Sequence, residues 1–312
     1  MEVTLLAKEQ IFGEKRLKIF DEYGTKARIT DFAKLLGGYA TSGQLQHTSD
    51  GKQINNCIGE WWLKDWSIEN WCTSIVCFNG KLAEFYCDFQ NRALGIRPTL
   101  PYSLISEICL NKVIINDKIL EIEYGEYPQY IVPKGFSRFL ESAYSKRLLN
   151  KTEKKYITDS VDVNYYNVPF KERIHIEYEY NRKRYIRVKA NFSYNENKKL
   201  SNGEKYKNGD YVWVEVSPIK WLVDIEKDTA LSKNILISGI QFDSNEMYEG
   251  DLEGTFIYKY LNTHFINDIQ IKQKEIEISV IEEKSERELA LEKLKKDKQK
   301  ILNLKRNLVN KR

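Results

Sequence analysis

Proline and histidine are scarce in this chain, and long apolar runs are missing. Only 6 prolines and 16 glycines occur among 312 residues, which excludes a collagen-like or wholly disordered chain. No segment approaches the roughly 18 consecutive apolar residues of a membrane-spanning helix, and the first residues lack the apolar core of a secretory signal. We therefore expect no membrane span, no classical secretion, and a location in the cytoplasm, or on a virion if a phage encodes the chain.

Cysteine usage excludes a disulfide framework, because the number is odd and no C-x-x-C pair occurs. No histidine lies at zinc-finger spacing, so the sequence predicts no metal site. The motifs G-x-S-x-G, H-E-x-x-H, the P-loop and G-x-G-x-x-G are also missing. We therefore predict no cofactor and no particular reaction. The cysteines, expected as small buried thiols in a reducing compartment, are Cys57, Cys72, Cys77, Cys87 and Cys109.

What the chain does have is aromatic residues and an uneven charge distribution. Aromatics make up 12% of the residues, a proportion typical of β-structure or of a large contact surface. Residues 272–312 contain 13 Lys and Arg and 8 Asp and Glu, so this segment is basic. Residues 1–271 contain the remaining 36 Lys and Arg and 37 Asp and Glu, so they are nearly neutral. The richness in Lys, Asn and Ile suggests a low-GC bacterium, or its phage or mobile element.

The C-terminal 41 residues predict a long charged helix. An apolar residue recurs every seven positions, as in a coiled-coil heptad, at Val280, Leu294, Ile301 and Leu308. Arg287 interrupts this pattern at the one polar position. Three interpretations remain open: a single helix, a short coiled coil that forms a homo-oligomer through residues 272–312, and a nucleic-acid-binding arm. The interspersed glutamates disfavour the last one, because they would repel phosphates.

Several local patterns predict secondary structure. Asn79-Gly80 between two apolar stretches is typical of a β-hairpin turn. Two strands are expected around Asn116-Asp117 and two more around Asn181-Arg182. Helices are expected at 134–150 and 256–265, and a short one near 31–36 with Thr30 or Asp31 as its N-cap.

Two sets of motifs carry a resemblance to known families. The first set is Trp61-Trp62-Leu63 and Gly95-Ile96-Arg97-Pro98. The second is Tyr127-Pro128-Gln129, Pro218-Ile219-Lys220-Trp221 and Leu231-Ser232-Lys233. Together they resemble the DUF6273 domains of unknown function of Firmicutes and their mobile elements. The W-W-L and G-x-R-P pair is also similar to the core signature of C-type-lectin-like folds.

The resemblance implies an α+β fold. It would have a C-type-lectin-like body of mixed and antiparallel β-structure with short helices, a β-rich insertion at about 125–205, and the long C-terminal helix. In this chain the half with the W-W-L and G-x-R-P motifs precedes the half with the Y-P-Q motif, which is the reverse of the order in the DUF6273 domains. We therefore expect residues 20–110 to pack with residues 205–268. The expected parts are 1–125 for the W-W-L half, 126–268 for the Y-P-Q half with the insertion, and 269–312 for the helix.

Most motif residues have a structural interpretation. Arg97 is expected to hold a chain crossing by donating to backbone carbonyls or a carboxylate, because a buried arginine must be paired. The alternative is that Arg97 faces a ligand. The calcium-binding E-P-N, Q-P-D and W-N-D motifs of sugar-binding lectins are missing, so calcium-dependent sugar binding is not expected. The structural signature comprises Trp61, Trp62, Gly95, Pro98, Tyr127, Pro128 and Trp221.

From these features we predict a non-catalytic recognition protein. It would bind a protein partner through an aromatic-rich surface, with Trp66 and Trp71 in an expected loop, and Arg97, as candidate contacts. Two alternatives stay open. One is an enzyme of unrecognised type in a cleft between the two halves; the other is nucleic-acid binding by the basic tail and the strands around Arg182-Lys183-Arg184.

Overall fold

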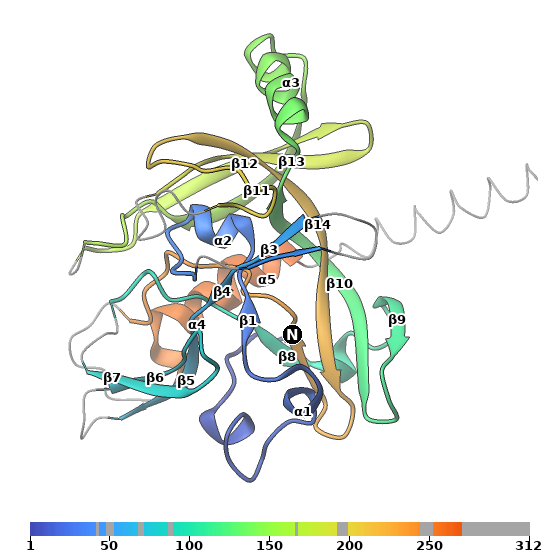
Figure 1. Ribbon diagram of the computed structural model, residues 1–312, viewed down its shortest axis with the longest axis vertical. Helices are drawn as coiled ribbons and strands as arrows, with labels where there is room; N and C mark the ends of the chain where they lie inside the picture. Colours follow the sequence, from blue (N-terminus) through green and yellow to red (C-terminus); the bar gives the residue numbers. More distant parts are fainter. Residues whose placement is uncertain are drawn as a thin grey trace, which may run out of the picture. The chain divides into compact units, whose positions relative to one another are not determined.

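Two long antiparallel strands organise the fold. In the computed structural model, β10 (Ile119–Ile131) and β14 (Tyr211–Asp224) pair along nearly their whole length (Figure 1). The structure describes residues 1–41, 44–47, 53–67, 72–86, 90–165, 168–191, 199–243 and 252–269, with the backbone alone at 44–47, 53–56, 66–67, 72 and 85–86. The chain divides into two compact units, Met1–Ile269 and Gln270–Arg312. The predicted C-terminal helix and its coiled coil lie outside the described residues.

The main sheet forks along β14. On one side of the spine, β10 pairs with β9 (Leu110–Ile114). On the other side, residues 211–216 of β14 pair with β13, whereas residues 221–224 pair with β15. Residues 217–220 therefore lie between two branches. The first branch is β13 (Lys183–Lys189), β12 (Glu172–Tyr180) and β11 (Asn150–Asp159), and the second is β15 (Thr229–Ser232) and β8 (Thr99–Pro101).

The remaining strands form three small antiparallel sheets. The hairpin predicted around Asn79-Gly80 is confirmed, because β6 and β7 pair and Gly80 has a φ of 85°. The predicted pairs β9–β10 and β12–β13 are confirmed as well. The small sheets are β1 (Ala27–Arg28) with β4 (Ile58–Gly59), β2 (Gln44–His47) with β3 (Gln53–Asn56), and β5 (Trp61–Ser67) with β6 (Cys72–Val76) and β7 (Leu82–Tyr86).

Helices are short in the described residues, and none is long and apolar enough to cross a membrane. The predicted Thr30 cap is confirmed, since its hydroxyl accepts a hydrogen bond from the Ala33 N–H. The fold is thus α+β, with mostly antiparallel sheets. The helices are η1 (Lys8–Gln10), α1 (Ile19–Tyr23), α2 (Asp31–Leu35), η2 (Tyr102–Leu104), α3 (Lys134–Ser145), η3 (Leu252–Gly254), α4 (Phe256–Tyr260), the π-helical η4 (Leu261–Phe265) and α5 (Ile266–Ile269).

Segments from both ends of the chain meet beside the spine. Residues 95–101 run between β5 and the segment 229–237, through a Trp61–Gly95 bridge, an Ile96–Ile237 bridge and the β8–β15 pair. Gly95 is required there, since a Cβ would lie 2.9 Å from the Glu60 carbonyl oxygen. The strands of residues 126–205 belong to this same main sheet.

The N-terminal segment is joined to the last helices of the first unit. The Val3 N–H donates to Asn262 Oδ1 at 2.9 Å, and Asn262 Nδ2 donates back to the Val3 carbonyl at 2.8 Å. Thr4 forms a bridge with Thr99 in the crossing segment. Residues 259 positions apart therefore complete one another's hydrogen bonds.

A fully buried ion pair ties residues 90–92 to the end of β11. Arg92 Nε lies 3.0 Å from Asp159 Oδ2, and both side chains have no exposed surface. Arg92 also donates to the carbonyls of Tyr165 and Val168, so the guanidinium is satisfied on three sides. The pair therefore fixes the loop that follows β11.

The Asp159→Asn substitution is expected to lower the free energy of unfolding by about 3–5 kcal/mol, because it leaves the buried Arg92 charge without its counter-ion. Urea unfolding at pH 7 measures the loss. Lys118→Ala, in the exposed pair with Glu226, is the control and should leave the midpoint unchanged. A loss below about 1 kcal/mol for the Asp159 variant would contradict the assignment.

Asp268 in α5 makes stability depend on pH. Its side chain is 8% exposed, its Oδ2 has no hydrogen-bond partner among the described residues, and burial raises its pKa to about 8. Between about pH 4 and pH 8 the unfolded chain ionises this carboxyl while the folded chain keeps it protonated. Asp268 therefore stabilises the fold less as the pH rises, by about 1.4 kcal/mol per pH unit.

We expect Asp268→Asn to be more stable than the natural chain at pH 7, with a difference that shrinks toward pH 4. Urea unfolding of both proteins at pH 4, 5.5 and 7 tests this. A stability difference that is the same at all three pH values would show that the carboxyl does not titrate in this way.

Candidate binding site at the fork of the sheet

A cavity of about 710 Å³ lies at the fork of the main sheet. It is lined by side chains of β10 and β14, by the end of α1, by β1 and the residue before it, by Arg97 and by the two residues that follow β15. We call it the fork pocket. Its volume falls within the range of about 300–1,000 Å³ that is typical of ligand sites.

The backbone at the fork is satisfied by one side chain. Gln129 is the extra residue of a β-bulge in β10, so it is free of the strand register. Its Nε2 donates to the Ser217 carbonyl, the Ser217 hydroxyl and the Pro218 carbonyl, each at 2.9 Å. Pro218 itself has no N–H to leave unpaired. Gln129 thus provides hydrogen bonds to the carbonyls of the two residues at which the stretch between the branches begins.

The fork pocket is strongly cationic. Five basic side chains line it against one carboxylate, Glu123. Glu121, beside the pocket, lies 2.5 Å from Lys233 Nζ and 3.5 Å from Lys220 Nζ. Within the described residues no carboxylate lies at ion-pair distance from the other three cations. These three are Lys26, Arg28 and Arg97.

Arg97 is a buried cation with only partial hydrogen bonding. It is 2% exposed, and its Nε donates to the Ser232 carbonyl at 2.7 Å. Nη2 lies 3.5 Å from the Lys233 carbonyl, and Nη1 has no partner among the described residues. The guanidinium lies 5.1 Å from the Trp61 ring. Burial lowers the pKa of Arg97 to about 9, so the group is still charged at neutral pH.

Two tyrosines add polar and aromatic surface to the pocket. The Tyr130 hydroxyl accepts from Asn234 Nδ2 at 2.9 Å, and its pKa rises to about 12, first through burial and then through the charge of Asp31. The ring of Tyr130 is nevertheless 37% exposed. The Lys233 ammonium lies 5.7 Å from the centre of the Tyr23 ring. Both phenols stay protonated at neutral pH, because burial also raises the pKa of Tyr23.

The ionisable groups of the lining are mainly cations and phenols. The titratable groups of the lining are cations, phenols with raised pKa values, and Glu123, which accepts from Asn111 Nδ2 at 2.6 Å and lies 4.0 Å from Lys220. None of them forms a nucleophile–base pair in the described lining. The pocket offers positive charge and hydrogen bonds to an anion.

The motifs singled out in the sequence meet at this pocket. Arg97 comes from the first set, and Gln129, Lys220 and Lys233 come from the three motifs of the second set. Their neighbours in the motifs are in the core: Trp61, Trp62, Tyr127 and Trp221 have at most 1% of their surface exposed. Gly95, Pro98 and Pro128 are buried too.

The two tryptophans expected in a loop are placed differently. The loop prediction is wrong for Trp66, which lies in β5 opposite Thr73; the β-structure extends past the Trp61-Trp62 motif because β6 provides a partner strand. The Trp66 side chain and all of Trp71 lie outside the described residues. Sequence reasoning missed Lys26, Arg28 and Tyr130, which belong to no motif and meet the pocket only through tertiary structure.

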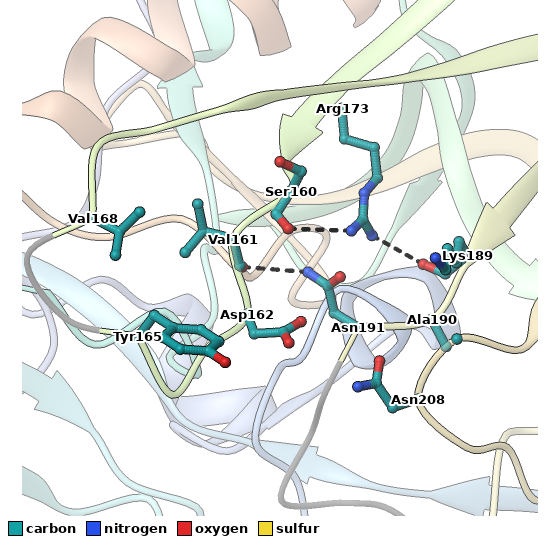
Figure 2. A pocket seen from close by; sticks show the side chains of 11 residues that line it. Ser160, Val161, Asp162, Tyr165, Val168, Arg173, Lys189, Ala190, Asn191 and Asn208 are labelled. Carbon is teal, nitrogen blue, oxygen red and sulfur yellow. Dashed lines mark hydrogen bonds between the residues drawn. The ribbon is translucent and has the colours of Figure 1, made fainter.

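A second cavity, of about 530 Å³, lies beside the loop after β11. Figure 2 shows Arg173 reaching across it to the carbonyls of Ser160 and Lys189, at 3.2 and 3.0 Å. Asn191 Nδ2 lies 3.5 Å from the Val161 carbonyl. These polar groups hold backbone segments together, so this cavity is a weaker candidate than the fork pocket.

No metal centre is found in the part of the chain that the structure describes, since no three His, Cys, Asp or Glu side chains converge there. Comparison of the chain with protein-family models, with curated proteins and with solved structures found no match. The function therefore has to be argued from the site itself.

An anion in the fork pocket should stabilise the fold through Arg97. At ten times its Kd, inorganic phosphate should add about 1.4 kcal/mol, a rise in Tm of roughly 2–4 °C, over sodium chloride of equal ionic strength. Arg97→Met should abolish the rise, whereas Arg97→Lys should keep part of it. Thermal unfolding measures all three proteins, and a full rise in folded Arg97→Met would show that phosphate binds elsewhere.

Proposed function

We propose that this chain is a non-catalytic recognition protein that binds a protein partner by holding an acidic segment of it in the fork pocket. The observation that carries the proposal is Arg97: a buried guanidinium whose Nη1 has no partner among the described residues, in a pocket lined by four further cations. A buried charge without a counter-ion is costly, and a carboxylate from a ligand removes that cost. Lys26 and Arg28 are exposed, and no carboxylate in the described part of the chain pairs with them, so they would steer the acidic segment to the site.

An acidic protein segment fits the pocket better than a nucleic acid does. Residues 1–271 carry 36 basic and 37 acidic side chains, so the positive charge is local and not a general property of the surface. Glu121 and Glu123 stand at the pocket and would repel a continuous phosphate backbone. A short segment with separated carboxylates can place its charges beside the cations and avoid these two glutamates.

The scaffold we propose is C-type-lectin-like, with its halves in permuted order and a resemblance to the DUF6273 domains. This is supported by the way in which residues 95–101 cross between β5 and the segment 229–237, and by the bond of 2.9 Å from Trp221 Nε1 to the Tyr124 carbonyl. In the described residues, Tyr23 and Tyr130 supply the aromatic part of the surface. The long C-terminal helix, assembly through residues 272–312 and the cytoplasmic or virion-associated location remain predictions of the sequence.

Charge reversal at the rim of the pocket tests the proposal. A fluorescein-labelled peptide of alternating glutamate and serine serves as the probe, with its affinity for the full chain measured by fluorescence anisotropy. The double variant Lys26→Glu, Arg28→Glu is expected to bind at least about tenfold more weakly, because two attractive charges become repulsive.

The matched control is Arg138→Glu, Lys146→Glu, which changes the net charge equally on exposed positions of α3 and of its C-cap. It should bind the peptide as the natural chain does. Equal weakening in both variants would mean that only overall charge matters, and the proposal would fall. Tighter binding of a single-stranded oligonucleotide than of the peptide, lost in the pocket variant, would favour the nucleic-acid alternative.

A further inference from the structure

The face of the sheet that carries the fork pocket continues onto an apolar edge strand. β9 is the last strand of the main sheet on the side of β10, and its outer edge has no partner strand among the described residues. Leu110 is 63% exposed and Val113 is 53% exposed. Exposed apolar side chains on an unpaired edge strand are unusual in a protein that binds no partner, because such an edge can pair with another chain.

Strand register places these two side chains beside the pocket. Lys220 of β14 pairs with Glu123 of β10, which in turn pairs with Leu110 of β9. Two residues along β10, Leu222 pairs with Glu121, and Glu121 pairs with Val113. The register shifts between these rows because β9 contains one extra residue there, so Leu110 and Val113 share a face although they are three positions apart. Residues directly opposite one another project from the same face of a sheet. Leu110 and Val113 therefore lie on the fork-pocket face, and Ile114, the last residue of β9, lies on the opposite face.

We infer that the acidic segment bound by this protein is amphipathic, with apolar side chains that lie on Leu110 and Val113 while its carboxylates lie in the fork pocket. This inference rests on the proposed function. Two strand spacings, about 10 Å, separate β14 from β9. An extended chain covers that distance in about three residues. Side chains of an extended chain alternate between its two faces, so only even spacings place two of them on the same side. The recognised pattern is thus an acidic residue followed or preceded, four positions away, by leucine, isoleucine or phenylalanine.

Two labelled peptides of equal charge test the inference by fluorescence anisotropy with the full chain. In the first, leucines stand four positions from each glutamate; in the second, serines replace the leucines. The leucine peptide is expected to bind about tenfold more tightly, since it buries two half-exposed aliphatic side chains. The double variant Leu110→Gln, Val113→Thr should bind both peptides equally. Ile114→Thr, on the same strand but the opposite face, should keep the tenfold preference.

The outcomes separate this inference from the proposed function. If both peptides bind alike to the natural chain, or if the double β9 variant retains the preference, the amphipathic pattern is wrong while pocket binding stands. If Ile114→Thr removes the preference as well, the effect is a general loss of strand structure and the inference is overturned. If Lys26→Glu, Arg28→Glu binds the serine peptide unchanged, the proposed function itself fails.

Discussion

The pairing of β10 with β14 is the interaction on which the rest of the structure depends. These strands supply the spine from which both branches of the sheet, the edge strand β9 and the packing surface of α5 are built. Because β14 is longer than either of its two partners on one side, the ladder there has to break. The break falls at Ser217 and Pro218, where the bulged Gln129 satisfies the exposed carbonyls. The fork pocket is thus a consequence of unequal strand lengths.

The cations of the fork pocket differ in whether a carboxylate neutralises them. The lysines of β14 and of the segment after β15 have Glu121 as a neighbour, so their ammonium groups are already compensated. Arg97 is held by carbonyl oxygens and by the face of Trp61 instead, which fixes its position without neutralising it. The positive charge of Arg97 is thereby held in one place in the lining of the fork pocket.

Local sequence chemistry predicted local structure well. The Asn79-Gly80 turn, the Thr30 cap and the strand pairs around Asn116 and Asn181 are all present, because each depends on residues that are close together in the chain. Arg97 was identified as a candidate contact, but the pocket around it was not, since its lining comes from segments as distant as Tyr23 and Asn234. Trp66 was assigned to a loop because the partner strand β6 cannot be seen from the residues around it.

The reciprocal hydrogen bonds between Val3 and Asn262 have a consequence for the order of folding. Val3 is synthesised 259 residues before its partner Asn262, at a synthesis rate of about 5–20 residues per second. Until Asn262 emerges, the N-terminal segment has no partner for Val3, and the crossing at residues 95–101 lacks the segment 229–237. Closing such long loops makes folding slow and leaves strand edges open in the meantime. The first unit therefore cannot complete its fold until residues 229–262 have been synthesised.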